Sequence, residues 1–276
     1  MPAGQVVSSS IGYLGDCVGK PTFGMKPERN NLPLTTAKVR VEDVRPIREQ
    51  LSLDVEGFVL ADHTTAVTDF TDREQVAAVY MRELEDLLKA LTGASKVSAS
   101  AGGVLRRGEK SPEFMKGGFT TPARFAHCDY SQNPAGSTFW TDPLLSEEEK
   151  ARYAGKRIAI YNLWRALTPP PQDTPLACVD ARTVADEDRV WSDCIIAPPP
   201  PAPELVFENC VFRPNPAHRW CYFKDMTPDE VLVFKGYDSD PARAAGVPHC
   251  AFDDPSCPPD APARESIDVR AFAFFD

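Results

Sequence analysis

From residue 96 onward, the sequence consists of short apolar segments separated by prolines and other turn-forming residues. Short segments with frequent turn signals are typical of β-strands in an antiparallel barrel or jelly roll. They therefore predict a mainly β fold. Two connections contain runs of proline, at 169–171 and 198–201, which favour stiff surface spacers. The expected strands are 157–164, 176–179, 205–212, 219–223, 231–234 and 266–274.

One segment before this region has the pattern of a helix. Thr71 is the expected N-cap, and Glu74 lies three residues later, which completes a capping box. Gly93 is the expected end of the helix. Because its apolar residues form one stripe, we expect this helix to cover an outer face of a sheet. The stripe consists of Val76, Val79, Tyr80, Leu84, Leu87, Leu88 and Leu91.

The first part of the chain has a different character. Residues 1–55 mix glycine, proline, serine and charged residues without a sustained period. We expect them to form an extended arm that packs on the rest of the protein. No break in composition requires a further boundary, so residues 56–276 are expected to form one β-rich domain.

The overall charge limits the classes of partner. With 40 acidic and 30 basic side chains, the net charge is −10, which argues against nucleic acid or an anionic membrane as a partner. The chain has no run of about 18 apolar residues and no secretory signal at its N-terminus. We therefore expect a cytosolic protein with no membrane span.

Eight cysteines are scattered along the chain without a CxxC pair. This spacing suits neither a zinc ribbon nor a thioredoxin-like site. In a reducing compartment, most of them are expected to be small buried core residues.

The tripeptide His127-Cys128-Asp129 is the strongest candidate for chemistry. In a strand, side chains at i and i+2 lie on the same face, so His127 and Asp129 can reach one metal ion while Cys128 points away. With His249 downstream, the three form a facial triad that suits a non-heme ferrous ion and leaves three positions open. Alternatively, both histidines are ordinary partly buried residues that make one hydrogen bond each.

Arg264 and Ser266 follow His249 by 15 and 17 residues and share one strand face. The opposite face is apolar. The polar face is therefore either exposed to solvent on an edge strand or directed into the interior of a barrel. In a barrel, a guanidinium and a hydroxyl can grip a carboxylate. A dicarboxylate co-substrate clamped there would reach the metal with its other end.

Two other histidines are weaker candidates for metal binding. His218 is the main rival, but it lacks a carboxylate two residues away. His63 lies beside Asp62, but consecutive residues diverge on a strand, so a structural hydrogen bond is the favoured role.

Three further residues are candidates for lining a substrate pocket: Asn162, Trp164 and Tyr222. Core packing is an equally good interpretation of Trp164. Because GxGxxG, Walker and Gly-x-Ser-x-Gly motifs are absent, the common nucleotide and hydrolase signatures do not compete.

An ordered series of short motifs lies between about residues 57 and 275. The motifs are Gly57-Phe58-Val59-Leu60, Asn162-Leu163-Trp164-Arg165, Pro175-Leu176-Ala177, Asp180-Ala181-Arg182, His218-Arg219-Trp220, Asp225-Met226, Asp229-Glu230-Val231, Lys235-Gly236-Tyr237-Asp238-Ser239, Pro248-His249 and Arg264-Glu265-Ser266-Ile267. In this order they resemble a fungal hydroxylase/desaturase family. This family includes AsaB-like proteins and gibberellin desaturase-like enzymes, and is related to the small component of the bacterial cephamycin 7α-methoxylase.

The resemblance implies a double-stranded β-helix core, which is a jelly-roll, cupin-like fold with flanking helices. It also implies an oxygenase of specialised metabolism that uses Fe(II), 2-oxoglutarate and O2, with ascorbate as a stimulant. By position, His127, Asp129 and His249 would hold iron, and Arg264 with Ser266 would bind the distal carboxylate of 2-oxoglutarate. The resemblance fixes neither the small-molecule substrate nor the choice between hydroxylation and desaturation.

Two hypotheses of other classes remain open from the sequence. One is a non-catalytic accessory or binding subunit of an oxygenase with a second protein component. The other is a zinc-dependent hydrolase or lyase that uses the same ligands, since imidazole and carboxylate also suit zinc.

Overall fold

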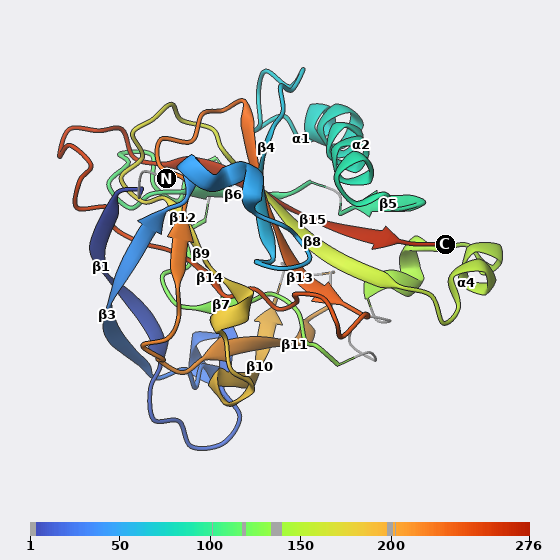
Figure 1. Ribbon diagram of the computed structural model, residues 1–276, viewed down its shortest axis with the longest axis horizontal. Coiled ribbons are helices and arrows are strands. Elements are labelled where there is room, and N and C mark those ends of the chain that lie inside the picture. The colour runs from blue at the N-terminus through green and yellow to red at the C-terminus, as the bar shows by residue number, and fades with distance from the viewer. Residues whose placement is uncertain (1–3, 101, 118–119, 134–139, 198–200, 202) are drawn as a thin grey trace.

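In the computed structural model, the described residues are 4–276 except 101, 118–119, 134–139, 198–200 and 202. Within them, the larger of two curled sheets contains nine strands, and the strands that carry His127 and His249 lie side by side near its middle (Figure 1). In spatial order the strands are β1 (Val6–Leu14), β3 (Leu34–Asp43), β12 (Trp220–Tyr222), β9 (Leu176–Val179), β14 (His249–Ala251), β7 (His127–Cys128), β11 (Leu205–Phe212), β10 (Arg189–Ile196) and β2 (Thr22–Gly24).

The second sheet is antiparallel and carries the Arg264–Ser266 segment. Its strands are, in spatial order, β4 (Phe58–Asp62), β13 (Glu230–Asp238), β8 (Ile158–Ala166), β15 (Glu265–Phe274) and β5 (Lys96–Ala99), and β6 (Val104–Arg107) also pairs with β15. The predicted mainly β architecture with flanking helices is therefore confirmed.

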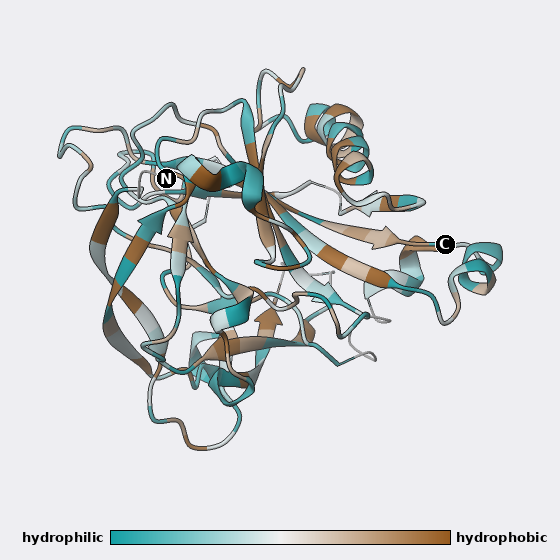
Figure 2. Ribbon diagram, viewed as in Figure 1, coloured by the Kyte–Doolittle hydropathy of each residue, from teal (hydrophilic) through white to brown (hydrophobic). Residues whose placement is uncertain are grey.

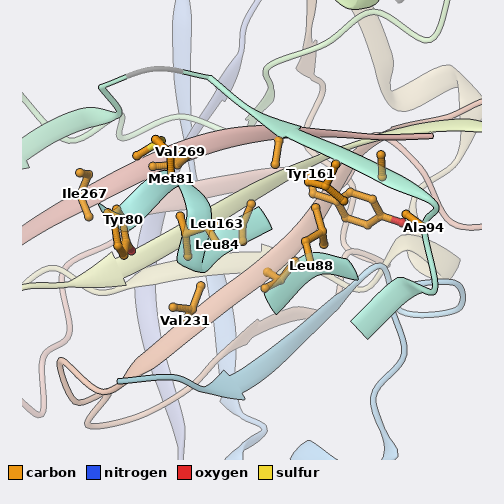
Figure 3. Packing of buried hydrophobic residues seen from close by; sticks show 14 of the residues in the cluster. Tyr80, Met81, Leu84, Leu88, Ala94, Tyr161, Leu163, Val231, Ile267 and Val269 are labelled. Atoms are coloured by element: carbon orange, nitrogen blue, oxygen red, sulfur yellow. The ribbon is translucent and has the colours of Figure 1, made fainter. Parts of the chain in front are cut away.

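One helical segment covers the outer face of the smaller sheet, as predicted. It consists of α1 (Arg73–Gln75), a π-helical turn η3 (Val76–Tyr80) and α2 (Met81–Thr92). Figure 3 shows Leu84 of α2 beside Leu163 of β8, and Met81 of α2 beside Val269 of β15. Figure 2 shows that α2 carries both hydrophobic and hydrophilic residues, as expected of a helix with one buried face.

The start of this helix differs from the prediction. The N-cap is Asp72, not Thr71, and its carboxylate accepts hydrogen bonds from the backbone N–H groups of Glu74 and Gln75. Thr71 is instead bound by the side chain of Asp69, which lies before the helix. The end is as predicted, because Gly93 has a φ of 70° and terminates α2.

The remaining helical elements among the described residues are short. The α-helix α4 (Glu147–Tyr153) begins with a capping box formed by Ser146 and Glu149. The 3-10 turns are η1 (Pro27–Arg29), η2 (Arg45–Gln50), η4 (Asp142–Leu144), η5 (Ala181–Thr183) and η6 (Asp186–Asp188).

The N-terminal segment packs on the core through regular strands. β1 pairs with β3, and β3 joins the sheet beside β12. The other side of β1 reaches the segment before β7, where Gly12 N–H donates to the Arg124 carbonyl (3.2 Å) and Ala126 N–H donates to the Gly12 carbonyl (2.8 Å). The larger sheet therefore curls until β1 meets the segment that leads into the His127 strand. A domain boundary near residue 55 stays a prediction.

Most of the cysteines are buried, as predicted for small core residues. All eight are free thiols. The buried ones are Cys128, Cys178, Cys210, Cys221 and Cys250. Among the helices in the described part of the chain, none is both long and apolar enough to cross a bilayer.

Candidate metal centre and carboxylate site

The two strands in the middle of the larger sheet bring three candidate ligands together. His127 on β7 lies directly opposite His249 on β14, and their ring centroids are 4.3 Å apart. Asp129 follows β7, with its Oδ1 at 3.6 Å from His127 Nε2. One ligand atom from each residue lies within 4.8 Å of the others. The set matches a two-histidine, one-carboxylate facial triad, which suits a ferrous ion.

Both histidines are oriented by the backbone. His127 Nδ1 lies 2.9 Å from the Phe125 carbonyl, and His249 Nδ1 lies 3.2 Å from the Val247 carbonyl. A carbonyl can only accept, so each Nδ1 carries the proton and each Nε2 keeps a lone pair for a metal. Burial, together with the positive charge that His249 can carry, lowers the pKa of His127 to about 4, so this ligand is neutral at pH 7.

Asp129 is held through one of its two oxygens. Its Oδ2 accepts hydrogen bonds from Asn162 Nδ2 (2.7 Å) and from Arg270 Nε (3.1 Å) and Nη2 (2.8 Å). Burial alone would raise the pKa of Asp129, but the charge of Arg270, together with the two histidines and the Asn162 hydrogen bond, outweighs burial and the pKa is lowered. Asp129 is therefore an anion whose Oδ1 is directed to the histidines.

A narrow cavity joins this triad to the smaller sheet. Its lining includes His127, His249 and the indole of Trp164, together with arginines from β6 and β15. The Trp164 ring also lies 5.5 Å from the Arg264 guanidinium carbon, a distance at which a cation–π interaction is favourable. Trp164 therefore packs in the core and lines the cavity at once.

Arg264 and Ser266 present unused hydrogen-bonding groups inside the protein. Both side chains are almost fully buried. Arg264 Nη1 donates to the Thr174 carbonyl (2.8 Å), but Arg264 Nε and Ser266 Oγ have no partner among the described residues. An unsatisfied buried donor costs about 1–3 kcal/mol. A carboxylate bound here would satisfy both groups, so the pair fits the distal end of a dicarboxylate.

The other sequence candidates occupy different places. Asn162 supports Asp129 from β8, as described above. Tyr222 is not among the residues that line the triad cavity. It lines a separate pocket of about 400 Å³ with Lys224 and Pro171, and its buried hydroxyl has no partner in the described part of the chain.

The two remaining histidines have structural partners. His218 lies between Asp188 (Nε2 to Oδ2, 3.0 Å) and the Tyr13 hydroxyl (3.1 Å from Nδ1), so both of its nitrogens are occupied. His63 Nδ1 accepts a hydrogen bond from the buried guanidinium of Arg165. The structural role predicted for His63 is confirmed.

Cys128 and Cys250 adjoin the ligands but belong to the core behind them. They pack in one apolar cluster with Val7 and Ile11 of β1. Burial raises the pKa of the Cys128 thiol to about 12, which disfavours the thiolate needed for metal binding or redox chemistry.

Three charged residues in the cavity, Arg270, Asp268 and Arg106, were not assigned a role from the sequence. Arg270 shares its strand face with Ser266, and this alternation could have identified it as a cavity residue. Arg106 on β6 also lines the cavity. No local pattern in the sequence indicates that position.

The sequence of this chain is similar to those of known proteins. Residues 16–274 match the family described as "Oxidoreductase/YMDC permease-like domain". The Fe(II)/2-oxoglutarate-dependent dioxygenase nvfI of Aspergillus novofumigatus is 34% identical over 252 residues, which are 88% of this chain and 85% of the relative. The chain belongs to this oxidoreductase family, the fungal Fe(II)/2-oxoglutarate-dependent dioxygenases.

Other members of this dioxygenase family match over nearly the whole length. The gibberellin cluster GA4 desaturase of Gibberella fujikuroi is 30% identical, covering 99% of this chain and 97% of the relative. A solved structure of the iron and alpha-ketoglutarate-dependent endoperoxidase NvfI superposes with a TM-score of 0.84 at 28% identity over 99% of each chain. The predicted jelly-roll core is thereby confirmed. Dioxygenases of this family use Fe(II), 2-oxoglutarate and O2.

Proposed function

We propose that this chain is an Fe(II)/2-oxoglutarate-dependent oxygenase that hydroxylates or desaturates a small-molecule intermediate of specialised metabolism. The observation that carries this proposal is the lining of one cavity. His127 and His249 of the two-histidine, one-carboxylate triad line it at one part, and Arg264 lines it at another. Arg264 Nε and Oγ of the nearby Ser266 have no partner among the described residues. The names of the relatives, which include a dioxygenase and a desaturase, support the same class of reaction.

The residues of the triad fit iron through defined atoms. His127 and His249 would bind it through Nε2, because their Nδ1 atoms are directed to backbone carbonyls. Asp129 would bind it through Oδ1, because Arg270 and Asn162 occupy Oδ2. When bound, ferrous iron with 2-oxoglutarate supplies the O2-dependent oxidation of an unactivated C–H bond.

The other residues of the cavity would bind 2-oxoglutarate, orient the substrate and exclude water. Arg264 and Ser266 would hold the distal carboxylate of 2-oxoglutarate, which supplies the charge and the acceptors that the pair lacks. Trp164 and Phe234 present apolar surface beside the ligands and would keep water from the reacting carbon. The choice between hydroxylation and desaturation would depend on where Trp164 and Phe234 hold the reacting carbon of the substrate.

The compartment, the kind of substrate and the need for a second protein are inferred from more general features of the chain and its relatives. We infer a cytosolic enzyme, since a reducing compartment suits eight free cysteines. The substrate is a small molecule, as the printed activities of the relatives suggest. We expect the isolated chain to turn over without a second protein component, and ascorbate to sustain its activity.

The decisive test is binding of the cofactors by metal-stripped protein without oxygen. Fe(II) and 2-oxoglutarate are added, and the weak visible charge-transfer band of the chelated ferrous complex is measured. We expect the band in the wild type and its loss in His249→Ala and Asp129→Ala. Arg264→Ala should keep iron binding but need more 2-oxoglutarate.

Three outcomes would contradict the proposal. Full activity of Asp129→Ala would refute the ligand assignment. A folded wild-type protein that shows no band, and no conversion of 2-oxoglutarate to succinate, would point to an accessory subunit. Activity with zinc but none with Fe(II) and ascorbate would point to a hydrolase or lyase.

A further inference from the structure

Arg106 lies beside the carboxylate site on a neighbouring strand. β6 pairs antiparallel with β15, and the register places Arg106 opposite Ser266 and Arg107 opposite Glu265. Residues directly opposite each other project to the same face of a sheet, with Cβ atoms about 5 Å apart. Arg106 therefore shares the face of Ser266 and Arg264 and lines the cavity. Its neighbour Arg107 projects to the other face.

The guanidinium of Arg106 has only neutral partners among the described residues. Its Nη1 donates to the Thr121 carbonyl (2.7 Å) and to Thr120 Oγ1 (3.2 Å). Arg270 in the same cavity is neutralised, because it pairs with Asp129 (2.8 Å) and Asp268 (3.1 Å). Arg106 thus has fixed hydrogen bonds that orient it but no ion pair within the described residues, and the two carboxylates whose charge reaches it, Asp268 and Asp129, are paired with Arg270.

Arg106 and Arg264 are two cations that line the same cavity. Arg264 also makes no ion pair within the described residues, and Nε of its guanidinium is buried without a partner. Burial, followed by the charge of Arg106, lowers the pKa of Arg264 to about 9. Two like charges that line one buried cavity destabilise each other unless an anion lies between them. The cavity is therefore short of negative charge beside Ser266.

We propose that Arg106 is a second cationic contact for the distal carboxylate of the 2-oxo acid co-substrate. One carboxylate oxygen would face Arg264 with Ser266, and the other would face Arg106. Arg106 would thereby select dicarboxylic over monocarboxylic 2-oxo acids. This inference rests on the proposed function, because it assumes that the Arg264–Ser266 pair receives that carboxylate.

The test compares two 2-oxo acids that differ only at the distal end. Anaerobic Fe(II)-loaded protein is titrated with 2-oxoglutarate and with 2-oxopentanoate, which lacks the distal carboxylate. Dissociation constants are read from the visible band and from titration calorimetry. Because a hydrogen bond to a charged group contributes a factor of about 10 or more to affinity, Arg106→Gln should weaken 2-oxoglutarate binding about tenfold or more. Its affinity for 2-oxopentanoate should stay within about twofold of the wild type.

Two matched variants control the experiment. Arg107→Gln makes the same change one residue away on the opposite face, and both affinities should stay at their wild-type values. Arg106→Lys keeps the charge without the planar fork, so it should restore part of the affinity for 2-oxoglutarate. If Arg106→Gln does not fold, as judged by its thermal unfolding, Arg106→Lys takes its place in the comparison.

Each contrary outcome has its own meaning. An unchanged dissociation constant for 2-oxoglutarate in Arg106→Gln would overturn the inference. Equal weakening of both 2-oxo acids would also overturn it, since it would place Arg106 at the end that the two molecules share. A wild-type protein that forms no complex with 2-oxoglutarate would instead refute the proposed function, because that measurement involves no Arg106 variant.

Discussion

Among the residues of the metal centre, Asp129 depends most on its neighbours. Its outer oxygen, Oδ2, accepts three hydrogen bonds from Arg270 and Asn162, while its inner oxygen is left for the metal. Partners of this kind orient a ligand and keep it ionised, and losing them typically lowers metal affinity by about 10–100-fold. Arg270 contributes two of the three hydrogen bonds and the charge.

We therefore expect Arg270→Gln to weaken metal binding by about 10–100-fold, because the carboxylate loses both its orientation and its counter-charge. The affinity can be measured by titrating metal-free protein with Co(II) and following the visible spectrum of the bound ion. Arg107→Gln, which removes a guanidinium bound to Glu265 on the far face of the sheet, is the matched control. Equal Co(II) affinity in Arg270→Gln and the wild type would show that Asp129 needs no such support.

The residues of the site differ in how far the sequence could reveal them. The pairs His127–Asp129 and Arg264–Ser266 are separated by one residue, so strand alternation alone predicts a shared face. Their meeting with His249 could be proposed only as a hypothesis. Arg106 was missed because its place is set by the register of β6 against β15. That register depends on tertiary packing, which leaves no local signal in the chain.

At the scale of secondary structure, β1 supports the ligand-bearing strand from behind. Gly12 approaches the segment before β7 so closely that an added Cβ would lie 2.7 Å from the Arg124 carbonyl oxygen. Real side chains do not occupy such a position without a shift of the backbone. The two hydrogen bonds between Gly12 and this segment depend on the same close approach.

We expect Gly12→Val to separate β1 from the Phe125 segment, lowering the free energy of unfolding by about 1–3 kcal/mol through overpacking. It should also weaken Co(II) binding, because the proposed ligand His127 lies only two residues after Phe125, which forms a β-bridge with Gly12. Denaturant unfolding and Co(II) titration measure the two effects. Gly15→Ala is the control, since its added Cβ would lie 3.4 Å or more from its neighbours. Wild-type stability in Gly12→Val would contradict the role given to this contact.

Strand and helix positions were predictable where local pattern and packing agree. The bounds 176–179 and 205–212 are those observed for β9 and β11. The predicted strand 231–234 extends to Asp238, because the buried charges Lys235 and Asp238 neutralise each other and interrupt the apolar pattern. β1 and β3 were not predicted as strands. Their side chains alternate between buried and exposed positions, but polar residues occur at both kinds of position, so the sequence shows no clear apolar alternation. The helix start was misplaced by one residue since both Thr71 and Asp72 can cap.

For the whole molecule, the histidines make stability depend on pH. The chain has four histidines, and burial is the largest cause of a lowered pKa in each of them: His63, His127, His218 and His249. In the unfolded chain a histidine binds a proton below a pH of about 6.5. The folded histidines, with their lowered pKa values, bind protons only at lower pH, so the unfolded state binds more protons and is stabilised relative to the folded state as the pH falls.

We expect the metal-free protein to lose stability as the pH falls below about 6.5, at about 1.4 kcal/mol per pH unit for each histidine that remains neutral when folded. Above that pH, the histidines should contribute no slope. Urea unfolding between pH 7.5 and 5.5 measures this dependence. His218→Gln, which removes one such group away from the metal centre, should reduce the slope, by at most one proton. A protein equally stable at both pH values would contradict the assignment of neutral buried histidines.

The closure of the larger sheet by β1 has a consequence for shortened versions of the protein. The match to the family begins at residue 16, whereas β1 ends at Leu14. A fragment cut at the family boundary would keep every proposed iron and co-substrate residue. It would nevertheless expose the apolar cluster behind Cys128 and Cys250 to water. Such a fragment should aggregate during expression, and an affinity tag is better placed ahead of β1 than in exchange for it.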